Sequence, residues 1–329
     1  MPLTRNITNG FCCRSIKKKK GRFLFLIILP TGDLSMNSKI SVIIPAYNEE
    51  KAMAKVLDDV AAVMQEQRYD FEIIVVDDCS TDKTAEIVKS KGVKLIKHEV
   101  NKGVGASRKT GILDCFGDIV VMLDADGTYP ASSIPELLKY LPEYDQVIGA
   151  RKKESGTLRI LRQPVKWVMF SLASFLVKEK IPDLNSGLRA IKKEILLKYL
   201  YLIPDGFSCV TTMTLVFLCN KYKIKYVPID YYKRIGKSKF RIFVDTRIFL
   251  FRIIKIILYF NPLIIFMPLS LFVLSIGVVK IIYSLFVVKS SLIRASGISI
   301  VIFGVCIYAF GLLADLIVTR LNKNNPPLI

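Results

Sequence analysis

Apolar runs and helix-like segments alternate along the chain from residue 39 onward. Ile40–Pro45 is a β-branched run that ends at a loop, and 51–67 has the spacing of an amphipathic helix. The alternation continues, and we predict strands at 72–78, 93–97 and 118–123 and helices at 84–91 and 104–116. Strands that alternate with helices predict an α/β fold, with helices on both faces of a mainly parallel sheet.

Two long apolar segments follow near the end of the chain. Leu263–Val288 has 26 residues with one charge, Lys280, and Ala295–Thr319 has 25 residues with one charge, Asp315. Each is long enough to cross a hydrocarbon core of about 30 Å as a helix. We therefore predict transmembrane helices at 263–288 and 295–319 that form a hairpin, with a hairpin buried in a protein core as the alternative.

The segment before the first span is amphipathic. Its polar residues recur at helical spacing between apolar ones: Arg241, Asp245, Arg252, Lys255 and Tyr259. We expect 241–260 to be a juxtamembrane helix lying in the membrane interface. The apolar stretch 167–177 is a second candidate for such a helix, with core packing as the alternative.

The first 35 residues carry seven basic residues and an apolar run of eight residues at 23–30. Eight residues cannot span a membrane, and no small-residue cleavage site follows them. We interpret 1–35 as a basic tail or as the result of a start codon placed too early, with a peripheral membrane contact as the alternative. The α/β domain is then expected at 36–240, with a short tail at 320–329 beyond the second span.

Composition narrows the classes of protein. The 329 residues carry a formal net charge of +20 and are 52% hydrophobic, which excludes a disordered chain, a collagen and a disulfide-rich miniprotein. The seven cysteines form no C-x-x-C pair, which favours reduced thiols, and the single histidine, His98, excludes a His-ligated zinc cluster. Chemistry must therefore use carboxylates, Lys, Arg and hydroxyls. The basic charge predicts an anionic partner without choosing among nucleic acid, membrane surface and phosphorylated small molecules.

Acidic side chains follow three predicted strands at the point where each strand ends, in 45–50, 77–82 and 124–127. Ligands of parallel α/β sheets bind beyond the carboxyl ends of the strands, so three acidic loops there predict a site. Asp124 and Asp126 flank one residue, so in an extended segment both carboxylates point to the same side, with room for a divalent cation between them and a diphosphate. A lone Asp-x-Asp is common by chance, but its place after an apolar strand makes it a strong signal.

These motifs resemble the signatures of the family 2 glycosyltransferases, which have the GT-A fold. The resemblance rests on Val42–Glu49, Val75–Asp82 and Leu123–Asp126, in that order. Further motifs are similar to those of its polyprenyl-phosphate branch, the dolichyl-phosphate mannose and glucose synthases: Gly149–Arg151, Asp183–Arg189, Arg234–Phe240 and Asn261–Leu263. The resemblance runs from about residue 39 to 320 and implies a Rossmann-like GT-A catalytic domain.

The resemblance implies an inverting, metal-dependent transfer of one sugar from a UDP- or GDP-hexose or N-acetylhexosamine to a polyprenyl monophosphate of the dolichyl type. The product would be a lipid-phosphate-sugar for glycan or protein glycosylation. Asp124 and Asp126 would hold Mg²⁺ or Mn²⁺, and the nucleotide-sugar would contact Pro45, Tyr47, Glu49, Asp78, Asp124, Ala125, Asp126 and Arg234. Thr128 stands where many mannose synthases have Gln, so the sugar stays open, as do the nucleotide and the choice of dolichyl or undecaprenyl acceptor.

The expected reaction needs no general base, because a phosphate monoester with a second pKa of about 6 is mostly a dianion near pH 7. It needs fixed cations that hold two anions close together. By resemblance, Arg151 and Arg162 are the catalytic ligands of the acceptor phosphate, with Lys166 beside them. A basic face that touches anionic lipid headgroups is the alternative.

Other functions fit the sequence less well. The segment 103–108 begins like a dinucleotide fingerprint, but Arg108 replaces its last Gly and the segment does not follow the first strand. Gln163–Trp167 is similar to a motif of processive polysaccharide synthases, but Lys166 replaces Arg and one hairpin makes no channel. A processive synthase and a non-catalytic nucleotide-binding membrane protein remain the alternatives, whereas nucleic acid is disfavoured by the acidic site. Access to cytosolic nucleotide-sugars predicts an integral membrane protein of the cell membrane whose catalytic domain is cytoplasmic.

Overall fold

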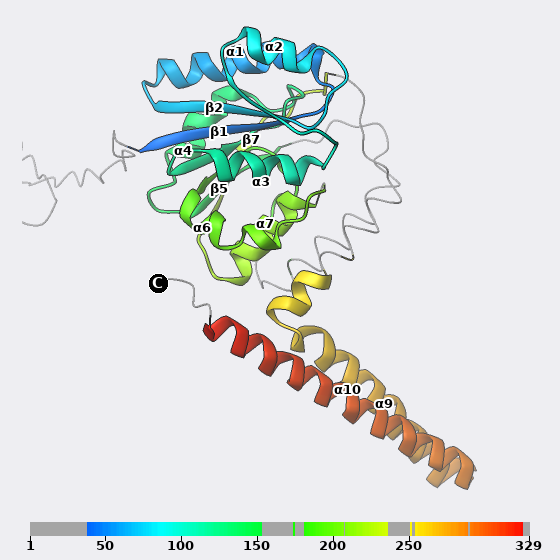
Figure 1. Cartoon of the computed structure of the whole chain (residues 1–329). Helices are drawn as coiled ribbons and strands as arrows, with labels where there is room; N and C mark the ends of the chain where they lie inside the picture. The colour runs from blue at the N-terminus through cyan, green and yellow to red at the C-terminus, as the bar shows by residue number, and fades with distance from the viewer. Residues whose placement is uncertain are drawn as a thin grey trace, which may run out of the picture.

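The computed structural model describes residues 38–152, 174, 181–206, 208–235, 251, 254–288 and 290–324. Its α/β domain contains the predicted alternation of strands and helices (Figure 1). The strands are β1 (Lys39–Ala46), β2 (Asp70–Asp77), β3 (Lys94–Lys97), β4 (Ile119–Met122), β5 (Gln146–Arg151), β6 (Arg189–Lys192) and β7 (Ile224–Ile229). The helices of the domain are α1 (Glu50–Glu66), α2 (Thr84–Ser90), α3 (Val104–Asp114), α4 (Ile134–Leu138), α6 (Lys193–Lys198) and α7 (Cys209–Cys219), with short 3₁₀ turns η1 (Ala131–Ser133) and η2 (Leu200–Leu202).

The seven described strands form one sheet in the order β3-β2-β1-β4-β6-β5-β7. β1 pairs in parallel with β2 and β4, and β5 pairs in parallel with β7. β6 is antiparallel to both of its neighbours, β4 and β5. The prediction of a mainly parallel α/β sheet is therefore confirmed, with one reversed strand at its centre.

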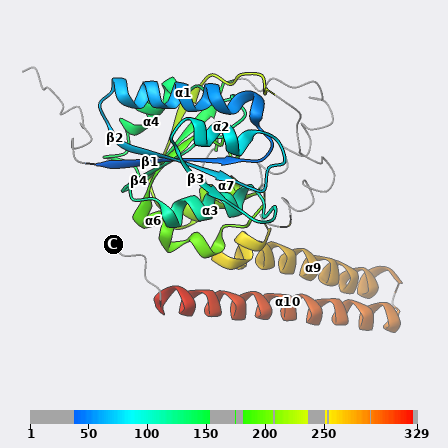
Figure 2. The ribbon, with the colours of Figure 1, turned by 45° about the horizontal axis from the view of Figure 1, so that its top comes forward.

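Alternate residues of β1 face opposite sides of the sheet, and a separate core covers each side. Val42 and Ile44 pack with the buried faces of α1, α2 and α4, whereas Ile43 packs with α3, α6 and α7. All three side chains are fully buried. The strand is apolar at consecutive positions because both faces of the sheet are covered (Figure 2). This double cover leaves the carboxyl-end loops as the accessible edge of the sheet.

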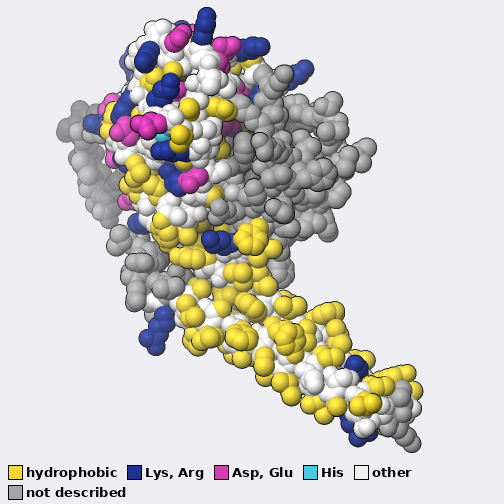
Figure 3. Space-filling model, turned by 45° about the vertical axis from the view of Figure 1, so that its right-hand side comes forward, with side chains coloured by type: hydrophobic (Ala, Val, Ile, Leu, Met, Phe, Trp, Pro, Cys, Tyr) yellow, Lys and Arg dark blue, Asp and Glu magenta, His cyan; other side chains and the backbone are white. Residues whose placement is uncertain are grey.

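Two long apolar helices project from the domain as a hairpin: α9 (Leu263–Tyr283), continued by a short π-helix (Ser284–Val288), and α10 (Ser291–Asn324). In their most apolar windows only 11% of the residues are buried, and Figure 3 shows apolar side chains on the outside of the hairpin. A hairpin buried in a protein core would be mostly covered, so these helices indicate a membrane protein.

A third cluster of buried residues joins the hairpin to the α/β domain. Ile256 and Ile257, in the helical turn just before α9, pack with Leu184 and with Leu215 of α7. The C-terminal part of the predicted juxtamembrane helix is therefore helical in 254–260. The tail at 1–35, Arg162, Lys166, most of 167–177 and residues 241–250 lie outside the described residues.

Candidate active site

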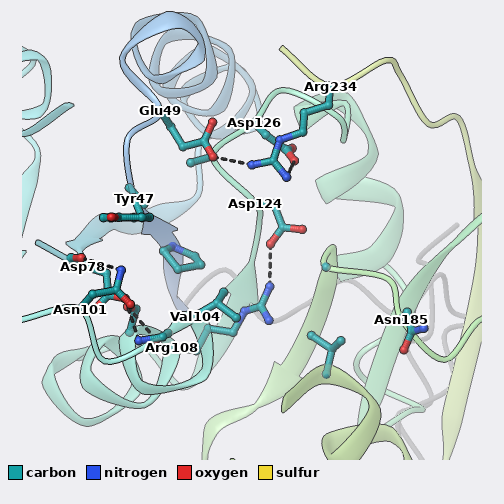
Figure 4. Close-up of a pocket in the computed structure, with 17 residues that line it drawn as sticks. Tyr47, Glu49, Asp78, Asn101, Val104, Arg108, Asp124, Asp126, Asn185 and Arg234 are labelled. Carbon is teal, nitrogen blue, oxygen red and sulfur yellow. Dashed lines mark hydrogen bonds and ion pairs between the residues drawn. The ribbon is translucent and has the colours of Figure 1, made fainter. Parts of the chain in front are cut away.

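A cavity of about 550 Å³ opens at the carboxyl ends of β1, β2 and β4. It contains all eight residues that the sequence predicted for nucleotide-sugar binding, brought together from four separate segments (Figure 4). The complete lining is Pro45, Ala46, Tyr47, Glu49, Asp78, Asn101, Gly103, Val104, Ser107, Arg108, Asp124, Ala125, Asp126, Asn185, Gly187, Val210 and Arg234. The structure therefore brings these residues together at one edge of the sheet.

Cross-links between neighbouring loops hold the first wall of the cavity. The N–H of Asn48 donates to Ser80 Oγ at 2.9 Å, and Asn48 Oδ1 accepts from the N–H of Thr81 at 2.8 Å. Asn48 adopts a left-handed backbone with φ of 51°, a conformation that Asn tolerates better than most residues. This turn directs Glu49 and Tyr47 toward the cavity from the end of β1.

Asp78, 3% exposed, is fixed by the chain itself. Its oxygens accept from the backbone N–H groups of Lys102 and Gly103 at 2.9 and 2.8 Å. His98 Nδ1 lies 2.7 Å from Asp78 Oδ1, and its Nε2 lies 2.9 Å from Thr110 Oγ1. The one histidine of the chain therefore orients the carboxylate proposed to meet the nucleotide, a role that the sequence did not indicate.

Asp124 is held between an arginine and a glycine. Arg108 Nη2 donates to its Oδ1 at 2.6 Å, and a Cβ on Gly187 would lie only 2.2 Å from its Oδ2. Gly187 is held in turn, because its N–H donates to Tyr129 Oη at 2.7 Å. No larger residue fits at position 187 while Asp124 keeps this position.

Asp126 is oriented by Thr128, whose hydroxyl and N–H donate to Asp126 Oδ1 at 2.6 and 3.1 Å. The pKa of Asp126 is raised above its ordinary value, first by burial and then by the negative charge of Asp124. The hydrogen bonds from Thr128 and the charge of Arg234 lower this pKa by less. Arg234 bridges two carboxylates, with Nη2 at 2.5 Å from Glu49 Oε1 and Nη1 at 3.5 Å from Asp126 Oδ2. Thr128 thus supports Asp126 beside the site.

The structure places Arg151 outside the cavity lining, at the end of β5. Its Nε and Nη2 donate to the two oxygens of Asp183 at 2.7 and 2.8 Å, and its guanidinium lies over the ring of Tyr231. Burial would raise the pKa of Asp183, but the hydrogen bonds from Arg151 and its charge outweigh burial and lower that pKa. Of the predicted acceptor-phosphate ligands, Arg162 and Lys166 lie outside the described residues.

The cavity lining offers ligands that suit a hard divalent cation, namely the carboxylate oxygens of Asp124, Asp126 and Glu49. Within the described residues no three acidic, histidine or cysteine side chains are grouped closely enough to form a metal site by themselves. A cation bound here would thus take its remaining ligands from a second molecule such as a diphosphate. Arg108 and Arg234 supply two positive charges beside these three carboxylates.

Sequence reasoning missed the wall opposite Tyr47. Asn101, Gly103, Val104, Ser107 and Arg108 line the cavity from the loop before α3 and its first turns, and Asn185 and Val210 also belong to the lining. In the sequence, the segment 103–108 resembles an incomplete dinucleotide fingerprint, and this pattern does not indicate that it lines the cavity. Its glycines are nonetheless required, because a Cβ on Gly105 would lie 2.0 Å from the carbonyl oxygen of Pro204.

The fold and the cavity define an α/β protein with an acidic site at the carboxyl ends of its strands, and comparison with known proteins identifies its family. Residues 41–200 match the model of glycosyl transferase family 2. Dolichyl-phosphate hexose transferase of Haloferax volcanii is 31% identical over 202 residues, which cover 61% of this chain and 86% of that protein. The chain therefore belongs to glycosyl transferase family 2 and is a glycosyltransferase.

Two further similarities agree with this assignment. Dolichol-phosphate mannosyltransferase of Pyrococcus furiosus is 31% identical over 217 residues, 62% of this chain and 59% of that protein. Glucosyl-3-phosphoglycerate synthase of Mycobacterium tuberculosis, solved with Mn²⁺, UDP-glucose and phosphoglyceric acid, has a TM-score of 0.56 at 21% identity, covering 67% of this chain and 80% of that chain. The structural similarity establishes the GT-A fold of the domain.

Proposed function

We propose that the protein transfers one sugar from a nucleotide-sugar to a polyprenyl monophosphate in the membrane. The observation that carries the proposal is the single cavity that unites Asp78, Asp124 and Asp126, in a chain that continues into two exposed apolar helices. Relatives named as dolichyl-phosphate hexose and mannosyl transferases support the lipid acceptor. A UDP- or GDP-hexose or N-acetylhexosamine is the proposed donor.

The donor would lie along the cavity, with the nucleoside between Tyr47 and Asp78 and the diphosphate near Asp124 and Asp126. These two carboxylates would hold Mg²⁺ or Mn²⁺, which when bound neutralises charge that develops on the departing diphosphate. Arg234, bonded to Glu49 and close to Asp126, adds a fixed positive charge at the same end. Its planar guanidinium suits phosphate oxygens.

The proposed reaction is a direct displacement at the anomeric carbon with inversion. An oxygen of the lipid phosphate forms the new bond to that carbon as the bond to the nucleoside diphosphate breaks, and the two electrons of the old bond leave with the diphosphate. The acceptor is already a dianion near pH 7, so no side chain has to remove a proton. The cations proposed to hold the acceptor phosphate are Arg151, Arg162 and Lys166. In the structure Arg151 forms an ion pair with Asp183.

The location follows from the same proposal. The hairpin α9–α10 would cross the membrane twice, with the catalytic domain and the residues after 320 in the cytoplasm, where nucleotide-sugars are made. The helical turn 254–260 would lie at the membrane surface, which holds the cavity near an acceptor whose phosphate stays at headgroup level.

The test is sugar transfer with the full-length protein in membranes. We expect organic-extractable label when a radiolabelled UDP- or GDP-sugar, polyprenyl phosphate and Mn²⁺ are supplied together, and loss of that label in EDTA or in Asp126→Asn. Asp58→Asn removes an exposed carboxylate paired with Lys91 and is the matched control, with activity expected to be unchanged. Transfer that persists in EDTA would contradict the metal site, and no transfer with any donor would contradict the proposed reaction.

A further inference from the structure

Arg108 is a buried cation in direct contact with the first carboxylate of the Asp-x-Asp motif. Its side chain, 3% exposed, reaches from α3 to Asp124 at the end of β4, where Nη2 donates to Oδ1 at 2.6 Å (Figure 4). Nη1 donates to Cys209 Sγ at 2.9 Å, at the first residue of α7. Arg108 Nε is buried without a hydrogen-bond partner among the described residues. A side chain that only packed the core would not leave a charged group so incompletely satisfied.

A second buried guanidinium, that of Arg189, lies close enough to Arg108 for the two charges to interact. Arg189 is fully buried nearby, and its guanidinium bonds to the carbonyl oxygens of Ser186 and Val210 and to Thr214 Oγ1. The pKa of Arg189 is lowered to about 10, first by burial and then by the positive charge of Arg108. Asp124 is the carboxylate that pairs with Arg108.

Asp124 is confined from its other side as well, since Gly187 packs against Oδ2. Asp126 is oriented differently, by Thr128 and by the more exposed Arg234. The two carboxylates of the motif therefore have separate supports: Arg108 for Asp124, and Thr128 with Arg234 for Asp126. Buried supports of this kind fix a ligand before its metal arrives.

We propose that Arg108 is the positioning residue of Asp124, holding that carboxylate in place for the metal and the diphosphate and tying it to α7 through Cys209. The inference rests on the proposed metal-dependent function and deepens it. Arg108 acts through Asp124 and is not itself a ligand of the donor. Its removal should therefore weaken metal binding more than it weakens binding of the nucleotide alone.

The experiment measures Mn²⁺ binding by electron paramagnetic resonance with UDP and, in parallel, GDP, and nucleotide binding in EDTA by calorimetry. We expect Arg108→Met to weaken Mn²⁺ binding by about tenfold or more, in the range seen when outer-shell supports of metal ligands are removed. Arg108→Lys keeps the positive charge but cannot bond Asp124 and Cys209 with two nitrogens of one planar group. Its Mn²⁺ affinity should therefore lie between those of Arg108→Met and the parent protein. Lys109→Met is the matched control: Lys109 lies next to Arg108 on α3 and its substitution removes only an ion pair with Asp205. This variant should bind Mn²⁺ and nucleotide like the parent protein.

The outcomes separate this inference from the proposed function. A parent protein that binds no Mn²⁺ with either nucleotide would overturn the metal-dependent function itself. Unchanged Mn²⁺ binding in Arg108→Met, or an equal loss of nucleotide binding in EDTA, would overturn the role of Arg108 alone. If Arg108→Met does not fold, Arg108→Lys carries the same comparison, and a selective loss of Mn²⁺ affinity is expected there too.

Discussion

At the scale of single residues, the ion pair of Arg151 with Asp183 is open to a direct test of stability. Asp183→Asn would leave the guanidinium, 12% exposed, without its carboxylate. Breaking a buried pair in this way costs about 3 kcal/mol of unfolding free energy, so we expect a clear fall in the melting temperature at pH 7. Thermal unfolding of the protein in detergent measures this melting temperature.

The pH dependence of this effect has a definite sign. Because the folded protein lowers the pKa of Asp183, the pair stabilises the fold above the unfolded value and loses that effect as pH falls through the lower, folded value. The difference between parent and Asp183→Asn should therefore shrink below about pH 4, near the ordinary carboxyl pKa. Asp230→Asn breaks the exposed pair with Lys152 and is the control; a melting temperature as low as that of Asp183→Asn would contradict the prediction.

At the scale of elements, three glycines seven residues apart let α10 lie against α9. A Cβ on Gly304 would lie 2.8 Å from Leu274 Cγ, and Gly297 and Gly311 meet Ile281 and Phe266 as closely. We expect Gly304→Leu to separate the helices and to cost about 2 kcal/mol, as overpacking does. Thermal unfolding in detergent tests this, with Phe303→Leu at an outward-facing position as the control. Equal melting temperatures for the two variants would show that the close approach is not needed.

Elements with a strong local pattern are those that the sequence predicted. β4 is an uninterrupted apolar run, β1 is apolar from Val42 to Ala46, and α1 buries residues at helical spacing. β5, β6 and β7 were not predicted. In β6 only two apolar residues lie between Arg189 and Lys192, and its strand conformation depends on pairing with β4 and β5. The eight residues expected to bind the nucleotide-sugar came from the resemblance to family 2 glycosyltransferases. Seven of them, all but Arg234, also lie at or just after strand ends, which converge in a parallel sheet.

The missed parts of the site depend on contacts that no local pattern carries. Arg108 lies on a helix, and nothing in its neighbours along the chain shows that its guanidinium reaches Asp124 and Cys209. His98 follows a short edge strand and meets Asp78 only through the packing of the loop after β3. Asn185 lies at this edge because the reversed strand β6 begins there, with Arg189 opposite Met122 at the carboxyl end of β4, and Val210 lies in the first turn of α7. These residues are identified by three-dimensional proximity alone.

At the scale of the whole molecule, a cluster of apolar side chains joins the hairpin to elements that line the cavity. Ile257, 1% exposed, packs with Leu184 in the loop that carries Asn185 and with Leu215 of α7, whose first turn lines the cavity. We expect Ile257→Ala to loosen the domain from the hairpin. Binding of Mn²⁺ and nucleotide should stay within about twofold, whereas transfer to a long-chain polyprenyl phosphate in a bilayer should fall about tenfold, because small displacements of bound reactants slow a reaction strongly.

The neighbouring residue supplies the control for this prediction. Leu258 is 36% exposed, so Leu258→Ala removes a similar side chain without opening the shared cluster, and it should transfer sugar like the parent protein. A short-chain polyprenyl phosphate in detergent separates the two causes of a loss, since its access to the cavity does not depend on how the domain sits on the membrane. Ile257→Ala should keep its activity with that acceptor. An equal loss with both acceptors would show instead that the contact stabilises the cavity itself.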